Sequence, residues 1–322
     1  MFPTPILLIT FNRPTHTRQV LQRIMEQQPQ KLYVFQDGAR EGNDADAQKC
    51  AEVRKVVEQL TAGTTTQLFT NYSDKNLGCG AGPATAISWF FANEEMGIVM
   101  EDDCLAHPDF FGYCDELLKK HADCEQVQFI NATLYHNRWK CNASYGFSHY
   151  MVTGAWAAWR RSWQGFDLDL EKIDAKRFRR QVRKITGNRA EVDWWYFKML
   201  DIKNDCSKKS YWDFQMQVHL FLNDAVTIHP CVNLISNIGF DPEGTHTLDN
   251  DGRGNLPINS ILPLVHPEKI DIDLKMDAEC FAKALPSDCW HDFLNHIYRT
   301  LLYSHGLGHW FLMKYKQLKN GK

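Results

Sequence analysis

The sequence predicts an α/β fold built on a mixed, mainly parallel sheet that is flanked by helices. Continuous apolar runs at 6–10, 32–35 and 98–100 are typical of strands that are covered on both faces. Between these runs, apolar residues recur at helical spacing. Strands that alternate with helices favour a parallel sheet. A length of 322 residues suits one large α/β domain, or one domain with an appended piece.

Four strands and three connecting helices are predicted in the first hundred residues. Pro14 suits the first turn of a helix, because its missing N–H is not needed there. A glycine-rich loop at 76–83 opens the third helix. The elements in order are a strand at 6–10, a helix with Val20, Leu21 and Ile24 on one face, a strand at 32–35, a helix at 45–60, a strand at 67–69, a helix that carries Ile87, Phe90 and Phe91, and a strand at 98–100.

The second half of the chain has fewer clear elements. Apolar spacing predicts a helix over 110–118, and β-branched and aromatic runs predict strands at 127–130 and 226–228. From about residue 261 onward we expect a helical C-terminal extension over 261–322. Its helices are predicted at 281–285, 290–302 and 310–318, on the strength of apolar stripes such as that formed by Phe293, Leu294, Ile297, Leu301 and Leu302.

Three acids, Glu101, Asp102 and Asp103, follow the strand at 98–100 without a break. Adjacent carboxylates raise one another's pKa, so such a cluster is electrostatically unfavourable by itself. At the exit of a buried strand, a cluster of this kind typically holds a hard divalent cation and the phosphates bound to it. A solvated acidic turn is the alternative. Because the apolar run directs the acids to one end of the sheet, we favour the metal site.

Charged residues also follow the first two predicted strands. Arg13 comes after the strand at 6–10, and Asp37 comes directly after the second strand and Gln36. Ligands of open parallel sheets bind beyond the carboxyl ends of the strands, so these side chains should share one edge with the acid triplet. Asp37 could instead be a turn residue, since Asp-Gly is a common turn dipeptide, and Arg13 could form a surface ion pair. One cation and four carboxylates at one edge predict a site for a nucleotide diphosphate with a metal.

An ordered set of motifs extends over about residues 5–240. The most specific motif is the acid triplet, which is followed after four residues by Pro108-Asp109-Phe110-Phe111. The whole set comprises 5–13, 36–38, 98–111, 154–159 and 211–213. In these motifs the chain resembles GT-A-fold nucleotide-sugar glycosyltransferases, most of all N-acetylglucosaminyltransferase I and its bacterial relatives. The resemblance implies a GT-A-like domain over 1–260, with a nucleotide-sugar-binding half (1–125) and an acceptor-binding half (126–260).

The resemblance also implies a role for each charged residue at the strand exits. Asp103 would ligate Mn²⁺ (or Mg²⁺), and the cation would bridge the diphosphate. Asp102 would face the ribose and Glu101 the donor sugar. Asp37 would accept a hydrogen bond from uracil and so select uridine, while Arg13 would lie beside the nucleotide, near its phosphates.

An inverting transfer needs a carboxylate that takes the proton of the acceptor hydroxyl. Asp213, after Ser210-Tyr211-Trp212, is the candidate catalytic base, because its hydrophobic setting would raise its pKa towards a useful range. The family pattern has a second acid after this one, where this chain has Phe214. Asp193, just before two tryptophans, is the rival candidate.

Three further segments suggest contacts with ligands or surfaces. The polar loop 241–254 has the composition of a lid, and His246 within it could touch the diphosphate or the metal, or be an ordinary loop histidine. Residues 172–189 carry eight basic side chains, which indicate a solvated helix face or a surface for an anionic acceptor or a membrane. The aromatic and lysine-bearing tail 310–322 could lie on a membrane or pack on the domain.

Composition narrows the class of protein. A net charge of −3 argues against nucleic acid as a partner. The ten cysteines include no CxxC pair and are expected to be reduced thiols. We also find no leader sequence and no run of about 18 apolar residues. These observations together predict a cytoplasmic protein that could be peripheral to a membrane.

The leading prediction is an inverting, metal-dependent glycosyltransferase. It would move a sugar, with N-acetylglucosamine among the candidates, from a UDP-sugar to a glycan or lipid-linked acceptor. A non-catalytic protein that binds sugar nucleotides or carbohydrate is the alternative from another class. A nucleotidyltransferase is disfavoured, because a glycine-rich phosphate loop with a basic residue directly after the first strand is missing.

Overall fold

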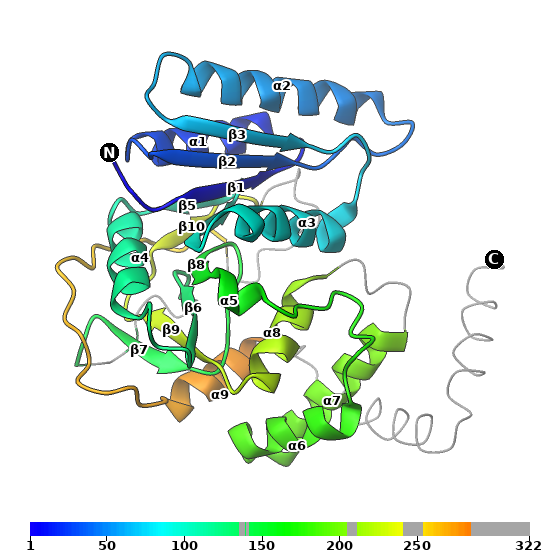
Figure 1. The fold of residues 1–322 in the computed structure, drawn as a ribbon, viewed down its shortest axis with the longest axis vertical. Helices are drawn as coiled ribbons and strands as arrows, with labels where there is room; N and C mark the ends of the chain where they lie inside the picture. The colour runs from blue at the N-terminus through cyan, green and yellow to red at the C-terminus, as the bar shows by residue number, and fades with distance from the viewer. Residues whose placement is uncertain (135–138, 140–141, 205–210, 241–253, 285–322) are drawn as a thin grey trace.

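The computed structural model describes residues 1–134, 139, 142–204, 211–240 and 254–284, and its centre is an eight-stranded sheet (Figure 1). The strand order is β3-β2-β1-β4-β8-β6-β9-β7. The strands are β1 (Ile6–Thr10), β2 (Lys31–Gln36), β3 (Gln67–Tyr72), β4 (Met96–Glu101), β6 (Val127–Asn131), β7 (Tyr145–Ser148), β8 (Ala155–Trp159) and β9 (Val226–Pro230). A separate antiparallel pair joins β5 (Cys104–Ala106) to β10 (Ile235–Asn237).

The sheet is mixed and mainly parallel, as the sequence predicts. Strands β3, β2, β1 and β4 are parallel neighbours, while β8 pairs antiparallel with both β4 and β6. The register places Ile9 of β1 opposite Glu101 of β4, and Thr10 opposite Gln36 of β2. The exits of β1, β2 and β4 therefore lie at the same level on one edge of the sheet.

Helices cover both faces of the sheet, because successive strand residues point to opposite sides. Ile6 and Leu8 pack towards α1 (Pro14–Met25), α2 (Asp44–Thr61) and α4 (Asp109–Lys120). Leu7 and Ile9 pack towards α3 (Gly78–Asn93), α5 (Arg160–Trp163) and α8 (Asp213–Leu222). This three-layer arrangement confirms the predicted fold class.

A third apolar cluster holds the remaining helices against α8. It joins α6 (Ala175–Thr186), α7 (Arg189–Asn204) and α9 (Leu274–Ala284), through Phe178, Trp195 and Phe281 respectively. In Figure 1 these helices lie below the sheet, at the end away from α2. The aromatic residues of this part of the chain thus serve chiefly as core.

The described part of the predicted C-terminal extension is only partly helical. Residues 261–273 run without a helix, and α9 begins at Leu274. Asp109 accepts hydrogen bonds from Ser260, Ile261 and Leu262, so this stretch is fastened to α4. The helices predicted over 290–302 and 310–318, and the membrane contact of the tail, lie outside the described residues.

The expectation that all cysteines are reduced thiols is wrong. Cys231, directly after β9, is disulfide-bonded. The other described cysteines, such as Cys50 and Cys104, are free. Sequence could not indicate this bond, because a disulfide depends on the approach of two distant residues rather than on local spacing.

Every helix within the described ranges is too short or too polar to span a membrane.

Candidate functional site

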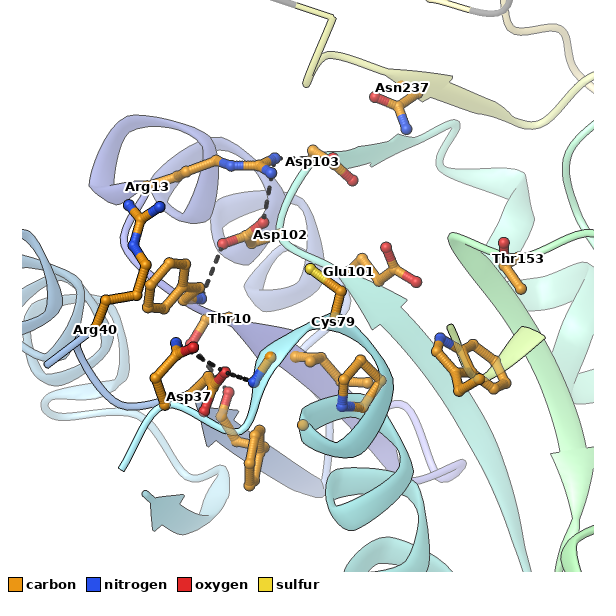
Figure 2. Close-up of a pocket in the computed structure, with 18 residues that line it drawn as sticks. Thr10, Arg13, Asp37, Arg40, Cys79, Glu101, Asp102, Asp103, Thr153 and Asn237 are labelled. Atoms are coloured by element: carbon orange, nitrogen blue, oxygen red, sulfur yellow. Dashed lines mark hydrogen bonds and ion pairs between the residues drawn. The ribbon is translucent and has the colours of Figure 1, made fainter. Parts of the chain in front are cut away.

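A cavity of about 390 Å³ opens at the edge where β1, β2 and β4 end (Figure 2). Its lining brings together five predicted site residues: Arg13, Asp37, Glu101, Asp102 and Asp103. The strand register accounts for this, because each residue follows a strand whose end lies at the same level. Carboxylates in the described lining outnumber guanidinium groups by four to two.

The acid triplet is held by the segment that follows β1. Asp102 is buried and its Oδ2 accepts a hydrogen bond from the backbone N–H of Phe11 at 3.2 Å. Arg13 Nη1 donates to Asp103 Oδ2 at 2.9 Å and lies 3.8 Å from Asp102 Oδ1. One guanidinium group therefore pairs with two of the three acids, and its single positive charge offsets only one of their negative charges.

Burial and mutual repulsion shift the pKa values of the triplet. Burial, together with the charges of Asp103, Asp102 and Asp213, raises the pKa of Glu101 to about 8. Burial also raises the pKa of Asp102 to about 6, although Arg13 opposes the shift. Burial alone would lower the pKa of Arg13, but the neighbouring acids outweigh it and raise that pKa. The cavity thus attracts positive charge and resists the ionisation of Glu101.

Asp37 is tied to the glycine-rich loop. Its Oδ1 accepts from the N–H groups of Gly38 and Leu77 at 2.9 and 2.8 Å, and its Oδ2 accepts from Gly78 N at 2.9 Å and Asn76 Nδ2 at 3.2 Å. A carboxylate has about four acceptor sites, so the chain itself engages all of them. Burial raises the pKa of Asp37, and the backbone N–H groups oppose this. Uracil recognition by Asp37 stays a prediction, and its scaffold role is an additional finding.

Arg40 lines the same cavity and was not predicted from the sequence. Its Nη2 donates to Asp46 Oδ1 at 2.9 Å, and Asn12 Nδ2 donates to the same oxygen at 2.7 Å. These contacts lower the pKa of Asp46 to about 2. A smaller cavity of about 290 Å³, lined by Asn12, Arg13, Arg40, Asp46 and Lys49 among others, adjoins the first one through the two arginines.

The turn after β10 covers the acid triplet from the side. Ile238 N donates to the carbonyl of Asp103 at 2.8 Å, and Gly239 N donates to Asn237 Oδ1 at 2.8 Å. A Cβ atom at Gly239 would lie 2.4 Å from Asp103 Oδ2 and 3.0 Å from Arg13 Nη1. Glycine is therefore required for this close approach.

Asp213 is the first residue of α8. Its neighbour Trp212 lines the cavity, and the charge of Asp213 contributes to the raised pKa of Glu101. Asp213 Oδ1 also accepts from Phe214 N at 2.9 Å. The candidate base is thus within electrostatic reach of the triplet, although it is absent from the cavity lining.

The rival candidate base, Asp193, is held in ion pairs between two helices, away from the cavity lining. It is buried within α7 and forms ion pairs with Arg179 of α6 and, at 3.8 Å, with Arg189. It does not line the cavity. The basic segment 172–189 corresponds to α6 and its flanks, where Phe178 and Val182 are buried. His246 and residues 241–253 of the predicted lid lie outside the described residues.

The donor set fits a hard divalent cation that arrives with phosphate. Asp103 offers a carboxylate oxygen at the cavity wall, and oxygen is the ligand atom that Mg²⁺ and Mn²⁺ prefer. Within the described ranges, no group of three His, Cys, Asp or Glu side chains forms a metal cage. Ions of this class typically take one or two carboxylates and complete their shell with substrate phosphates and water.

Sequence reasoning missed several residues of the cavity. The glycine-rich loop carried a signal for Asn76, Cys79 and Pro83, but no role was assigned to them. Thr153 and Asn237 come from segments far along the chain and carried no local signal. The further lining residues are Ile9, Thr10, Phe11, Phe35, Arg40, Gly78, Gly82 and Trp212.

Comparisons with known proteins give remote similarities only. No model of a known protein family matches the chain, and no curated protein matches it. Among solved structures, apo-UDP-glucose pyrophosphorylase is similar at 10% identity and a TM-score of 0.39, covering 73% of this chain and 92% of that one. HddC from Yersinia pseudotuberculosis complexed with GMP-PN is similar at 8% identity and a TM-score of 0.33, covering 51% and 80%. A putative glucose-1-phosphate thymidylyltransferase from Bacillus anthracis is similar at 9% identity and a TM-score of 0.32, covering 61% and 83%.

Proposed function

We propose that the protein is an inverting, metal-dependent glycosyltransferase that uses a UDP-sugar. One observation carries the proposal: acids and a cation from the exits of three parallel strands line one cavity, and α8 begins at Asp213, directly after the lining residue Trp212. A cavity with surplus carboxylates would repel a free diphosphate. It accommodates a diphosphate that is neutralised by a divalent cation.

Each charged residue of the site would have a separate role in the reaction. Asp103 would hold the cation, and the bound cation would stabilise the negative charge of the departing diphosphate. Arg13 would supply a second positive charge to the phosphates. Asp102 would contact the ribose and Glu101 the donor sugar. Asp213 would accept the proton of the acceptor hydroxyl as that oxygen attacks the anomeric carbon.

The test measures UDP release from a panel of UDP-sugars, including UDP-N-acetylglucosamine, with glycan and lipid-linked acceptors and with or without Mn²⁺. We expect release that requires both Mn²⁺ and an acceptor. Asp213→Asn should lower kcat by about 10²–10⁴-fold while UDP and Mn²⁺ still bind, since general-base catalysis contributes about that factor. Asp103→Ala should abolish Mn²⁺-dependent release.

Glu95→Gln is a matched control, because Glu95 is an exposed acid at the other end of β4. It should keep wild-type turnover. Wild-type turnover by Asp103→Ala would contradict the proposal. Binding of UDP-sugars without any turnover would favour the non-catalytic alternative. Formation of pyrophosphate from a nucleoside triphosphate and a sugar 1-phosphate would favour the nucleotidyltransferase alternative.

A further inference from the structure

We propose that Arg13 competes with the divalent cation for Asp103 and transfers from Asp103 to the diphosphate when the donor binds. This makes Arg13 a positioning residue that couples metal binding to nucleotide binding. The inference rests on the proposed function, because it assumes that a cation and a diphosphate share the cavity.

The competition follows from the contact between the two side chains. Arg13 Nη1 donates to Asp103 Oδ2 at 2.9 Å, and both side chains are largely shielded, with 14% and 15% of their surfaces exposed. Charge-assisted hydrogen bonds of this length are among the stronger polar contacts in proteins. A cation that takes the same oxygen must displace the guanidinium group or share the oxygen with a second positive charge.

Sharing is disfavoured by electrostatics. A guanidinium group and a divalent cation on one carboxylate would repel each other at close range, and the low exposure reduces screening by water. Asp102 offers Arg13 only a longer contact of 3.8 Å, and its own Oδ2 already accepts from Phe11 N. Of the two acids, Asp102 thus gives Arg13 the weaker contact.

The surroundings of the pair define where Arg13 can go. A Cβ atom at Gly239 would lie 3.0 Å from Arg13 Nη1, so the turn after β10 lies against the guanidinium group. His16 bonds the carbonyl of Ile238 at 3.2 Å, and Ile238 N donates to Asp103 O, which fastens that turn. Movement towards the turn is therefore restricted. Arg13 also lines the cavity, where the diphosphate would lie.

The exchange predicts positive coupling between the two ligands. A diphosphate that draws Arg13 away from Asp103 makes the metal site more available, so UDP should raise the affinity for Mn²⁺. By thermodynamic linkage, Mn²⁺ must raise the affinity for UDP by the same factor. Part of this factor should disappear when Arg13 is neutralised.

The experiment measures Mn²⁺ affinity by electron paramagnetic resonance and UDP affinity by calorimetry, each with and without the other ligand. Arg13→Gln should raise the affinity for Mn²⁺ alone by about fivefold or more and weaken UDP binding in the presence of Mn²⁺ by about tenfold, the scale of one charged hydrogen bond. These changes have opposite signs, which a misfolded site would not produce. The coupling factor should fall correspondingly.

Two variants serve as controls. Arg13→Lys keeps the charge and should remain within about twofold of the wild type in Mn²⁺ affinity, since a salt-bridging ammonium still competes. Arg40→Gln removes a charge from the same cavity, but Arg40 pairs with Asp46 and not with the triplet. Its affinity for Mn²⁺ alone should stay near that of the wild type.

The outcomes separate the two proposals. If the wild type binds no UDP with Mn²⁺, the proposed function is overturned. If the wild type binds both ligands but Arg13→Gln leaves the affinity for Mn²⁺ alone unchanged or lowers it, the exchange is overturned while the function stands. A rise in Mn²⁺ affinity of equal size in Arg40→Gln would also overturn the exchange, because it would reduce the effect to the general charge of the cavity.

Discussion

Asp37 shows how one side chain combines a predicted role with a role that the sequence does not reveal. The resemblance assigns it to uracil, whereas the structure surrounds its carboxylate with donors from Gly38, Asn76, Leu77 and Gly78. Burying a carboxylate is unfavourable unless hydrogen bonds compensate for the lost water. The exit of β2 and the glycine-rich loop therefore depend on each other through this one residue.

Asp37→Asn should lower the free energy of unfolding by about 1–3 kcal/mol, because the new amide NH₂ would face backbone N–H donors and leave them unsatisfied. UDP binding should weaken together with the binding of other nucleoside diphosphates, since the loop itself is disturbed. Denaturant unfolding and calorimetry with UDP and CDP test this.

Asn76→Ala is the matched control, because it removes one of the four donors and leaves the backbone contacts. Its effect on stability should be smaller. If Asp37→Asn instead keeps full stability and loses only the preference for UDP over CDP, then base recognition is the dominant role of Asp37.

At the level of elements, β4 is the strand on which the site depends. It lies between β1 and β8 and delivers the triplet to the cavity. Gly97 lets this strand approach its neighbours, since a Cβ atom there would lie 2.3 Å from Phe90 Cζ and 2.8 Å from the backbone oxygen of Pro5. The backbone of Pro5 cannot yield as a side chain can.

Gly97→Ala should therefore destabilise the protein by about 1–3 kcal/mol, the usual cost of overpacking a core. Gly112→Ala is the matched control within α4. A Cβ atom there would meet only the end of the flexible Leu262 side chain at 2.9 Å, and alanine favours helix. Denaturant unfolding should show a loss for the first variant and little change for the second. Equal stability of both variants would contradict this account.

Elements with a strong local pattern were predictable from the sequence. Strands β1, β2 and β4 are continuous apolar runs, and their order with intervening helices also fixed the edge at which Arg13 and the triplet gather. Strand β8 was not predicted, because Ala155–Trp159 is buried throughout and shows neither alternation nor a β-branched run. Strand β8 lies between β4 and β6 because of long-range pairing, which no local sequence pattern indicates.

The same distinction applies to the site. Residues that follow a strand directly, such as Asp37 and Asp103, could be placed from the sequence. Asn237 reaches the cavity, and Gly239 lies against Asp103, because β10 pairs with β5, a contact between segments more than a hundred residues apart. Their proximity to the site depends on the whole fold, so no local pattern could assign them to it.

At the scale of the whole molecule, one continuous sheet joins the predicted nucleotide-binding and acceptor-binding halves. Two buried histidines, His121 beside β7 and His229 within β9, respond to acid. Burial lowers the pKa of His121 to about 4, with help from the charges of Lys120 and His266, and burial lowers the pKa of His229 to about 4 against a bond to the Tyr150 carbonyl. His229 Nε2 must carry the proton of that 2.8 Å bond, so its buried Nδ1 stays unprotonated.

The lowered pKa values of these two histidines predict the sign of their own contribution to the pH dependence of stability. Unfolded histidine binds a proton near its ordinary pKa of about 6.5, so between pH 6.5 and 4 the unfolded chain holds more protons than the folded one. The contribution of these two histidines to stability must therefore fall as the pH falls through this window, by about 1.4 kcal/mol per pH unit for each histidine, whereas the raised pKa values of Glu101 and Asp102 act in the opposite direction. Below about pH 4 both states are protonated, and this contribution stops growing.

Denaturant unfolding at several pH values between 7 and 4 isolates this contribution as the difference in slope between the wild type and each histidine variant. His229→Gln keeps a donor for the Tyr150 carbonyl and cannot titrate, so it should remove about one histidine's share of the slope, about 1.4 kcal/mol per pH unit. His121→Gln should remove a similar share, and the double variant both shares. An unchanged slope in both single variants would contradict the assignment to these histidines.

Because β4, β8 and β6 connect the two halves of the sheet, tryptophan fluorescence and circular dichroism should report one coincident unfolding transition. Separate transitions would show that residues 1–125 and 126–260 unfold independently.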